Sequence, residues 1–222
     1  MRTRRRFSQD QEGTPWTVLS DVAIAMVLVL VVYLVLQFLV TFREQYINGQ
    51  LVLRQQEVQR MIYAEVDRNT VRIDSIAPDR QKLTFQSELL FPECGASLTR
   101  QGDSLLARVG RVLGSVEQYF EEVRVEGHAD AQPIGGCDFE SNWELSSRRA
   151  TSVVHFFVSM DLIANRKLSA IGRAEFQPDD PLNFDPSDPL NFDRNRRIEL
   201  GLLYSRRDIE EAMKRETNGS GS

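Results

Sequence analysis

One carboxyl group lies at the front of a long apolar run, LSDVAIAMVLVLVVYLVLQFLV, at residues 19–40. An ionised aspartate costs about 2.5 to 3.5 kcal/mol at the centre of a membrane helix and somewhat less near its edge. Desolvation also raises the pKa of such an acid, so a proton or a cation can neutralise it and leave again. Asp21 is therefore a candidate ion-carrying residue.

A helix cap or an interfacial acid is the competing interpretation of Asp21, because aspartate is preferred at caps. The stretch GTPW offers an earlier helix start, with Thr14 as the cap and Pro15 at the first helical position. Asp21 would then lie about 9 Å along the axis, at ~1.5 Å per residue, beyond the amides that need a cap. The remaining faces of this helix are almost entirely Val, Leu, Ile and Ala, so another subunit must shield the acid.

The apolar run is long enough to cross a membrane. Residues 22–40 are interrupted only by Tyr33 and Gln37, and no small-residue cleavage site follows, which favours a retained helix over a cleaved signal peptide. The cluster RTRRR at residues 2–6 holds the N-terminus in the cytoplasm by the positive-inside tendency. We therefore predict a basic cytoplasmic segment at residues 1–14 and a transmembrane helix at residues 15–42.

The composition narrows the remaining function classes. The chain has 222 residues and a net charge of −5, so its bulk charge does not indicate nucleic-acid binding. It has only two histidines and no metal-ligand or nucleophile–base constellation, so we expect no metal site, no cofactor and no enzyme activity. The tail at residues 206–222 ends in GSGS, which resembles an added linker and is left out of the fold argument.

Residues 43–80 are predicted to connect the membrane helix to a single globular domain. Leu51, Val58 and Ile62 are at helical spacing, and TVRIDSI alternates as a short strand does. One interpretation is a solvated spacer. The other is a short helix that packs against its twin in a dimer or plugs an ion path.

From residue 81 the pattern alternates between strands and helices. QKLTFQSELLF, EVRVEGHAD, KLSAIG and RRIELGLLY are predicted strands. Thr99 is expected to cap a helix with an apolar stripe from Leu105 to Val116, and a second helix is expected at about residues 142–160. The fold class is therefore α/β, with a βαβαββ order and helices on one face of a mixed sheet.

Four ordered motifs carry a family resemblance. VEGHADAQPI, NWELSSRRATSVVHFF, KLSAIGRAE and NRRIEL resemble the successive motifs of the OmpA-like peptidoglycan-binding domain, over residues 81–205. In that family an aspartate after the second strand and an arginine on the second helix grip the charged groups of diaminopimelate in the peptidoglycan stem. The resemblance implies these roles for Asp130 and Arg149.

Further residues belong to the implied peptidoglycan site. Asn142 and Leu145 complete the N-x-x-L-S-x-x-R-A pattern that contains Arg149. Arg196 and Arg197, in NRRIEL, either border the site or form structural ion pairs. An amino-acid zwitterion carries an ammonium group, which a carboxylate can bind, and a carboxylate, which a planar guanidinium can bind through two hydrogen bonds.

The only two cysteines, Cys94 and Cys137, are expected in loops at the same end of the sheet. An oxidising compartment permits a disulfide between them. Closing a loop of this length would stabilise the fold by about 4 kcal/mol in the chain-entropy estimate.

A short repeat, DPLNFDPSDPLNFD, precedes the last strand at residues 180–193. Two copies cannot make a solenoid, so we predict a duplicated surface loop; an acidic cation-binding loop is the alternative.

An apolar span with a membrane aspartate, followed by an OmpA-like domain, resembles the MotB-type subunit of ion-driven rotary stators. The resemblance implies an inner-membrane homodimer inside a ring of about five MotA-like subunits, with Asp21 carrying H⁺ or Na⁺. The C-terminal domain would be periplasmic and would hold peptidoglycan. ExbD- and TolR-type subunits share the membrane aspartate but lack this domain.

The stretch DVAIAM lacks the aromatic-Met pattern usual after the aspartate in flagellar members. This favours a non-flagellar relative, such as the MotB-like subunit of the Zorya anti-phage defence system. A flagellar stator subunit and a passive peptidoglycan tether without ion transport are the alternatives.

Overall fold

The computed structural model describes residues 15–132, 134, 138–182, 185 and 189–211. The chain divides into two compact units, Met1–Tyr46 and Ile47–Ser222. The first helix, α1 (Pro15–Glu65), contributes to both units. Because the units are not placed relative to one another, each is described by itself.

The first unit contains the N-terminal part of α1. The helix begins at Pro15, as predicted, while the predicted cap Thr14 lies outside the described residues. The side chains described from Trp16 to Tyr46 are exposed, and most of them are large and apolar. Soluble proteins rarely expose an apolar surface of this size to water. The helix is long and apolar enough to cross a membrane.

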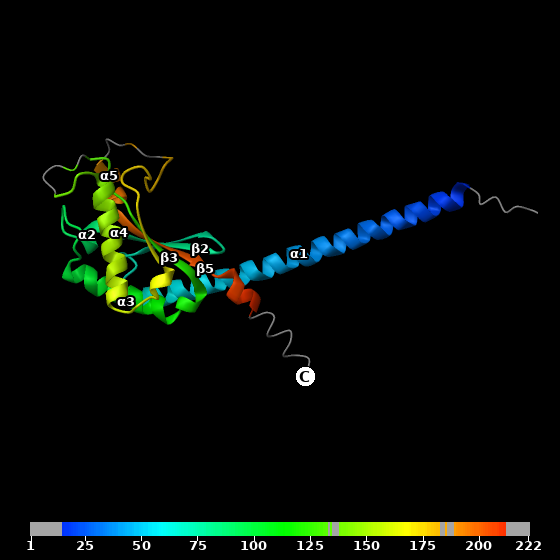
Figure 1. Cartoon of the computed structure of the whole chain (residues 1–222), viewed down its shortest axis with the longest axis horizontal. Helices are drawn as coiled ribbons and strands as arrows, with labels where there is room; N and C mark the ends of the chain where they lie inside the picture. Colours follow the sequence, from blue (N-terminus) through cyan, green and yellow to red (C-terminus); the bar gives the residue numbers. More distant parts are fainter. Residues whose placement is uncertain (1–14, 133, 135–137, 183–184, 186–188, 212–222) are drawn as a thin grey trace, which may run out of the picture. The chain divides into compact units, whose positions relative to one another are not determined.

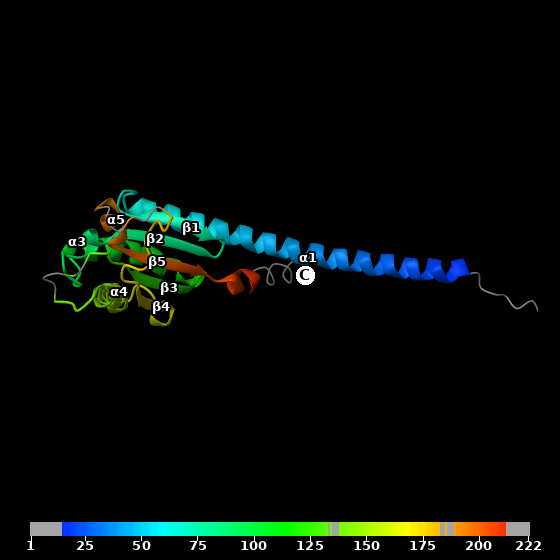
Figure 2. The same ribbon diagram turned by 90° about the horizontal axis from the view of Figure 1, so that it is seen from above.

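The second unit is built on a five-stranded mixed sheet, which confirms the predicted fold class. Its strands are β1 (Arg72–Ala77), β2 (Arg80–Gln86), β3 (Phe120–Gly127), β4 (Leu168–Gly172) and β5 (Arg197–Tyr204). Figure 2 shows them in the order β1-β2-β5-β3-β4. Only β3 and β4 pair in parallel, so β2, β3 and β4 run one way and β1 and β5 run the other.

The long helices pack on one face of this sheet. The helical elements are α2 (Ser87–Leu90), α3 (Arg100–Ser115), η1 (Glu117–Tyr119), α4 (Asn142–Ser159), η2 (Asn165–Lys167) and α5 (Pro189–Asn195). Alternate β5 residues from Ile198 to Tyr204 share one core with the apolar stripe of α3. Thr99 caps α3 as predicted, since its Oγ1 accepts from the Gly102 N–H at 3.0 Å.

The C-terminal part of α1 belongs to the globular unit and is not a separate connector. The predicted stripe of Leu51, Val58 and Ile62 is completely buried in the same core as the sheet. Gln55 Nε2 donates to the carbonyls of Ala77 and Pro78 at 2.7 and 3.0 Å, at the β1–β2 turn. The globular unit therefore starts at residue 47 and not at residue 81, because this stripe and β1 complete its core.

Residues 189–193 of the second DPLNFD copy are helical and not a loop. They belong to α5, which ends at Asn195 just before β5. The Asn195 Oδ1 accepts from the Asp179 N–H at 2.9 Å, so α5 ties the segment after β4 to the start of β5. Parts of the first copy, and the residues that join the copies, lie outside the described residues.

Leu51→Ala tests the role of α1 in the core, and Leu53→Ala is its matched control. Leu51 is fully buried, whereas Leu53 is 57% exposed two positions later on the same helix. We expect Leu51→Ala to lower the free energy of unfolding by about 2 to 5 kcal/mol through lost burial and a cavity. Leu53→Ala should change it by less than about 0.5 kcal/mol. Urea unfolding of residues 47–211 measures both; equal effects would show that residues 47–65 are a spacer.

Candidate functional site

Three strand ends meet where the sequence-predicted site residues lie. Strand β5 runs antiparallel to both of its neighbours, so its start lies beside the ends of β2 and β3. The Arg196 carbonyl accepts from the Ser87 N–H at 2.8 Å, and the Arg197 carbonyl accepts from the His128 N–H at 2.9 Å. Figure 1 shows α2, α5 and the start of α4 at this same end of the sheet.

A cleft of about 470 Å³ opens at this end. Residues of the loops after β2 and β3 form its walls together with the first turns of α4. The lining residues are Ser87, Glu88, Phe91, Pro92, Glu93, Cys94, Ala129, Asp130, Gln132, Ile134, Asn142, Leu145, Arg149 and Arg196. All five residues predicted to bind peptidoglycan are in this set.

Asp130 is the buried carboxylate of the cleft, whereas Glu88 and Glu93, which also line it, are exposed. Its Oδ2 lies 2.7 Å from Arg196 Nη1, and its Oδ1 accepts from the Gln132 N–H at 3.0 Å. The Asn142 side-chain amide donates to the carbonyls of Asp130 and Gln132 at 3.1 and 3.2 Å. Asn142 therefore holds the loop after β3 against the start of α4.

Arg149 also lines the cleft and is only 5% exposed. Its Nε donates to the Gly95 carbonyl at 2.8 Å and its Nη2 to the Pro92 carbonyl at 3.3 Å. The guanidinium also lies 5.3 Å from the centroid of the Phe91 ring. Burial lowers the pKa of Arg149 to about 10, and the positive charge of Arg196 adds to this shift. Arg149 thus remains cationic at neutral pH in a poorly solvated position.

The arrangement suits a ligand that carries both signs of charge. Two guanidinium groups share the cleft with the buried carboxylate of Asp130 and the exposed carboxylates of Glu88 and Glu93, so an amino-acid zwitterion can pair with both signs of charge. Ser87 adds a further polar group, because its Oγ is buried without a hydrogen-bond partner among the described residues. An unpaired buried hydroxyl carries a desolvation cost that a polar ligand can remove.

Arg196 both borders the cleft and forms ion pairs, so the two interpretations of this residue hold together. It contacts Asp130 and also Asp193 of α5. Arg197, the next residue in the chain, is 3% exposed and contacts Glu199 instead. Of these two adjacent arginines, Arg196 lines the cleft and Arg197 does not.

Two predicted residues lie outside this cleft or outside the description. Asp21 is exposed on α1 in the first unit. Cys94 lines the cleft at a positive φ of 53°, but Cys137 is not among the described residues. None of the described cysteines is free, in keeping with the predicted bond, whose pairing stays a prediction.

The wall from Ser87 to Cys94 differs from the sequence prediction, which made QKLTFQSELLF one continuous strand. The structure ends β2 at Gln86, forms the helix α2 at SELL, and runs β2 in the same direction as β3. Loops after such strands reach the same edge of a sheet. Phe91 and the carbonyls that hold Arg149 come from this stretch.

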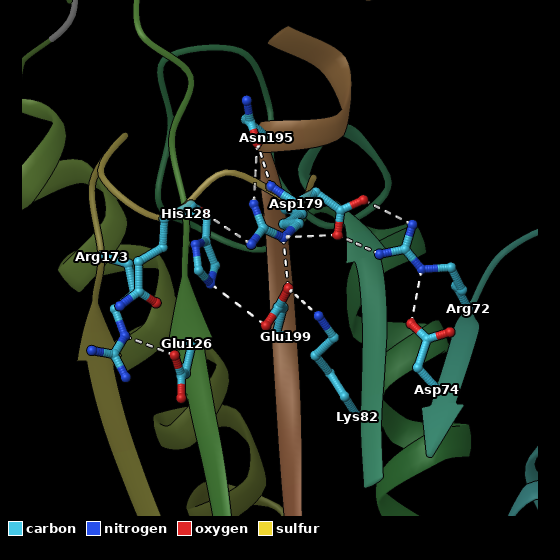
Figure 3. A network of polar contacts seen from close by, with 11 residues as sticks. Arg72, Asp74, Lys82, Glu126, His128, Arg173, Asp179, Asn195 and Glu199 are labelled. Atoms are coloured by element: carbon cyan, nitrogen blue, oxygen red, sulfur yellow. Dashed lines mark hydrogen bonds and ion pairs between the residues drawn. The ribbon is translucent and has the colours of Figure 1, made fainter. Parts of the chain in front are cut away.

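A charged network on the other face of the sheet fixes the start of β5, as Figure 3 shows. Glu199 Oε1 lies 2.7 Å from Arg197 Nε and 3.0 Å from Lys82 Nζ. Asp179 accepts two hydrogen bonds from Arg72 of β1. Salt bridges lower the pKa of both Glu199 and Asp179 against the opposing effect of burial.

His128 is enclosed by this network at the end of β3. It is 2% exposed, and its Nε2 lies 3.7 Å from Glu199 Oε2. Burial, and then the positive charge of Arg197, lower the pKa of His128 from 6.5 to about 4. The folded protein therefore holds this imidazole neutral in the pH range where an unfolded chain would protonate it.

Comparison with known proteins finds similarity to a known family in the globular unit. The OmpA family matches residues 90–191. The chain carries an OmpA-like domain. Among curated proteins, Motility protein B of Bacillus subtilis is 25% identical over 96 residues, which are 43% of this chain and 36% of the relative. The chain spans less than half the length of the curated relatives it matches.

Two solved structures share the fold of the OmpA-like domain. The cell wall anchor of the T6SS from Pseudomonas aeruginosa is 27% identical with a TM-score of 0.57, covering 67% of this chain and 97% of that one. A putative MotB-like protein from Desulfovibrio vulgaris is 23% identical with a TM-score of 0.61, covering 71% and 99%. The chain is thus similar to MotB-like proteins over its OmpA-like domain, and an apolar helix precedes that domain.

His128→Gln tests the buried imidazole, and His155→Gln is the matched control because His155 is exposed. Between pH 6.5 and 4 the unfolded chain binds a proton at His128 and the folded chain does not, so stability falls as the pH falls. We expect this residue to account for up to about 3 kcal/mol of that loss. Urea unfolding at several pH values should show a flatter profile for His128→Gln, and the wild-type slope for His155→Gln.

Proposed function

We propose that this chain is a peptidoglycan-anchored, ion-conducting subunit of a MotA/MotB-like rotary motor in the bacterial inner membrane. The proposal is supported by one chain that combines an acid on an exposed apolar helix with a cleft of both charge signs in an OmpA-like domain. The N-terminus would be cytoplasmic, because RTRRR precedes the span, and the OmpA-like domain periplasmic. Two copies would sit inside a ring of MotA-like subunits.

The cleft chemistry supports peptidoglycan as the anchor. The diaminopimelate residue of the stem peptide presents an ammonium and a carboxylate on one carbon. Asp130 is the group for the ammonium, and Arg149 is the group for the carboxylate, with Arg196 beside it. The relative from Pseudomonas aeruginosa is itself described as a cell wall anchor. A fixed attachment is what a stator needs if ion flow is to turn its partner.

The chemistry of Asp21 supports ion transport over a passive tether. It is the only Asp, Glu, Lys or Arg from Pro15 to Phe42, on a helix whose side chains are exposed. A charge that moves down the membrane potential supplies about 2.3 kcal/mol per 100 mV, which a neutralisable carboxylate can couple to conformational change. Either H⁺ or Na⁺ fits this group. A MotA-like ring would supply the shielding that a single helix lacks.

Arg149→Ala tests the anchor, and Arg148→Ala is the matched control. The Arg148 side chain is 68% exposed on the outer side of α4, whereas Arg149 is buried in the cleft. Loss of a charged hydrogen-bonding group worth about 1.5 to 3 kcal/mol should weaken co-sedimentation with purified peptidoglycan roughly tenfold or more. Arg148→Ala should bind as the wild type does. Unchanged binding of a folded Arg149→Ala protein would remove this residue from the site.

Asp21→Asn tests ion transport in cells that also express the MotA-like partner. We expect membrane insertion and peptidoglycan binding to persist while motor function is lost, because an amide cannot be protonated and released. Ser20→Ala controls for a change at the neighbouring position.

The lost function identifies the motor in the same experiment. Protection against phage infection should disappear if the chain serves a Zorya-type defence motor, as the stretch DVAIAM favours, and swimming should disappear in a flagellar one. Full function of Asp21→Asn would instead favour a passive tether. Replacing Na⁺ in the medium separates sodium from proton coupling.

A further inference from the structure

Two aromatic side chains form an exposed pair near the cleft. Trp143 and Phe176 are 51% and 64% exposed, and their ring centroids lie 5.5 Å apart at an interplanar angle of 26°. Every other aromatic side chain described in the globular unit is buried or partly buried. Core packing does not account for this pair, because most of its apolar surface faces solvent.

The structure ties this pair to both walls of the cleft. Trp143 follows the cleft residue Asn142 on the first turn of α4. On the other side, the Ala174 carbonyl accepts from the N–H of Ala129, which lines the cleft, at 2.9 Å. The Ala174 N–H donates to Ser146 Oγ of α4 at 3.1 Å, which holds the segment that carries Phe176 against this helix.

The segment of Phe176 turns sharply before the ring emerges. Ala174 is fully buried and has a φ of 49°, a conformation that side-chain-bearing residues rarely adopt. Two hydrogen bonds hold it there, so the position of the following aromatic ring is set by the fold. The pair is therefore an ordered surface and not a loose loop tip.

We propose that Trp143 and Phe176 are a stacking platform for a sugar ring of the peptidoglycan glycan strand. This inference rests on the proposed function, since the stem peptide that would enter the cleft is covalently attached to that strand. The apolar C–H face of a pyranose packs on an aromatic ring, and its hydroxyl groups remain in water, so an exposed aromatic pair suits it. The platform would add affinity for intact peptidoglycan beyond the charge pairs in the cleft.

The test compares two ligands on the full-length chain in detergent. One is a diaminopimelate-containing stem tripeptide, and the other is the same tripeptide attached to its disaccharide. We expect the disaccharide to tighten binding roughly tenfold in the wild type, as for one well-packed aromatic contact. Trp143→Leu and Phe176→Leu should each abolish most of this gain and leave tripeptide binding unchanged. Met160→Ala, at an exposed apolar residue just after α4, should retain it.

Tryptophan fluorescence gives an independent readout. Trp16 and Trp143 are the only two tryptophans, so Trp16→Phe leaves Trp143 as the sole reporter. The disaccharide ligand should change its emission and the tripeptide should not. Equal affinity of the wild type for both ligands, or a full gain in both Leu variants, would overturn the platform while the cleft stands. If neither ligand binds the wild type, the proposed anchor function itself fails.

Discussion

The position of β5 between β2 and β3 is the constraint on which the cleft depends. Because β5 is antiparallel to both neighbours, its first residues lie where the neighbours end. The carbonyls of Arg196 and Arg197 accept hydrogen bonds from the first residues beyond β2 and β3. Glu199 of β5 also lies 3.0 Å from Lys82 Nζ of β2, which links the start of β5 to its neighbour. Arg196 can therefore present its guanidinium to Asp130 from a rigid base.

The charge balance of the cleft indicates the sign of the ligand group that enters it. Arg149 and Arg196 are close enough for Arg196 to lower the pKa of Arg149, and Asp130 only partly offsets this effect. A carboxylate placed between the two guanidiniums would relieve their repulsion and compensate for the desolvation of Arg149. An ammonium alone could pair with Asp130, which already contacts Arg196, or with the exposed Glu88 and Glu93. A ligand with both groups makes use of the whole set.

The sequence predicts those parts of the fold whose signals are local. The Thr99 cap, the apolar stripe of α3 and the alternation in β3 and β5 all reappear in the structure, because each depends on residues within a few positions. The five residues predicted to bind peptidoglycan could be named from the sequence, because each lies in or beside a motif that resembles the OmpA-like family. The packing of α1 could not, because the stripe of Leu51, Val58 and Ile62 suits a dimer, a plug or a core equally well. Only the tertiary partners decide between these, and β1 and β2 supply them.

The burial of residues 47–65 bears on how an anchored motor would carry load. Leu51 and Ile62 share one core with Leu106 and Leu200, so a force on the cleft reaches α1 through packed side chains and hydrogen bonds such as those of Gln55. Close-packed interiors are stiff and transmit strain, whereas a flexible linker extends first and absorbs the load. A stator must resist the torque that it generates. Because Leu51, Val58 and Ile62 pack in the core of the globular unit, no flexible linker separates the cleft from residue 47 in the part of the chain that the structure describes.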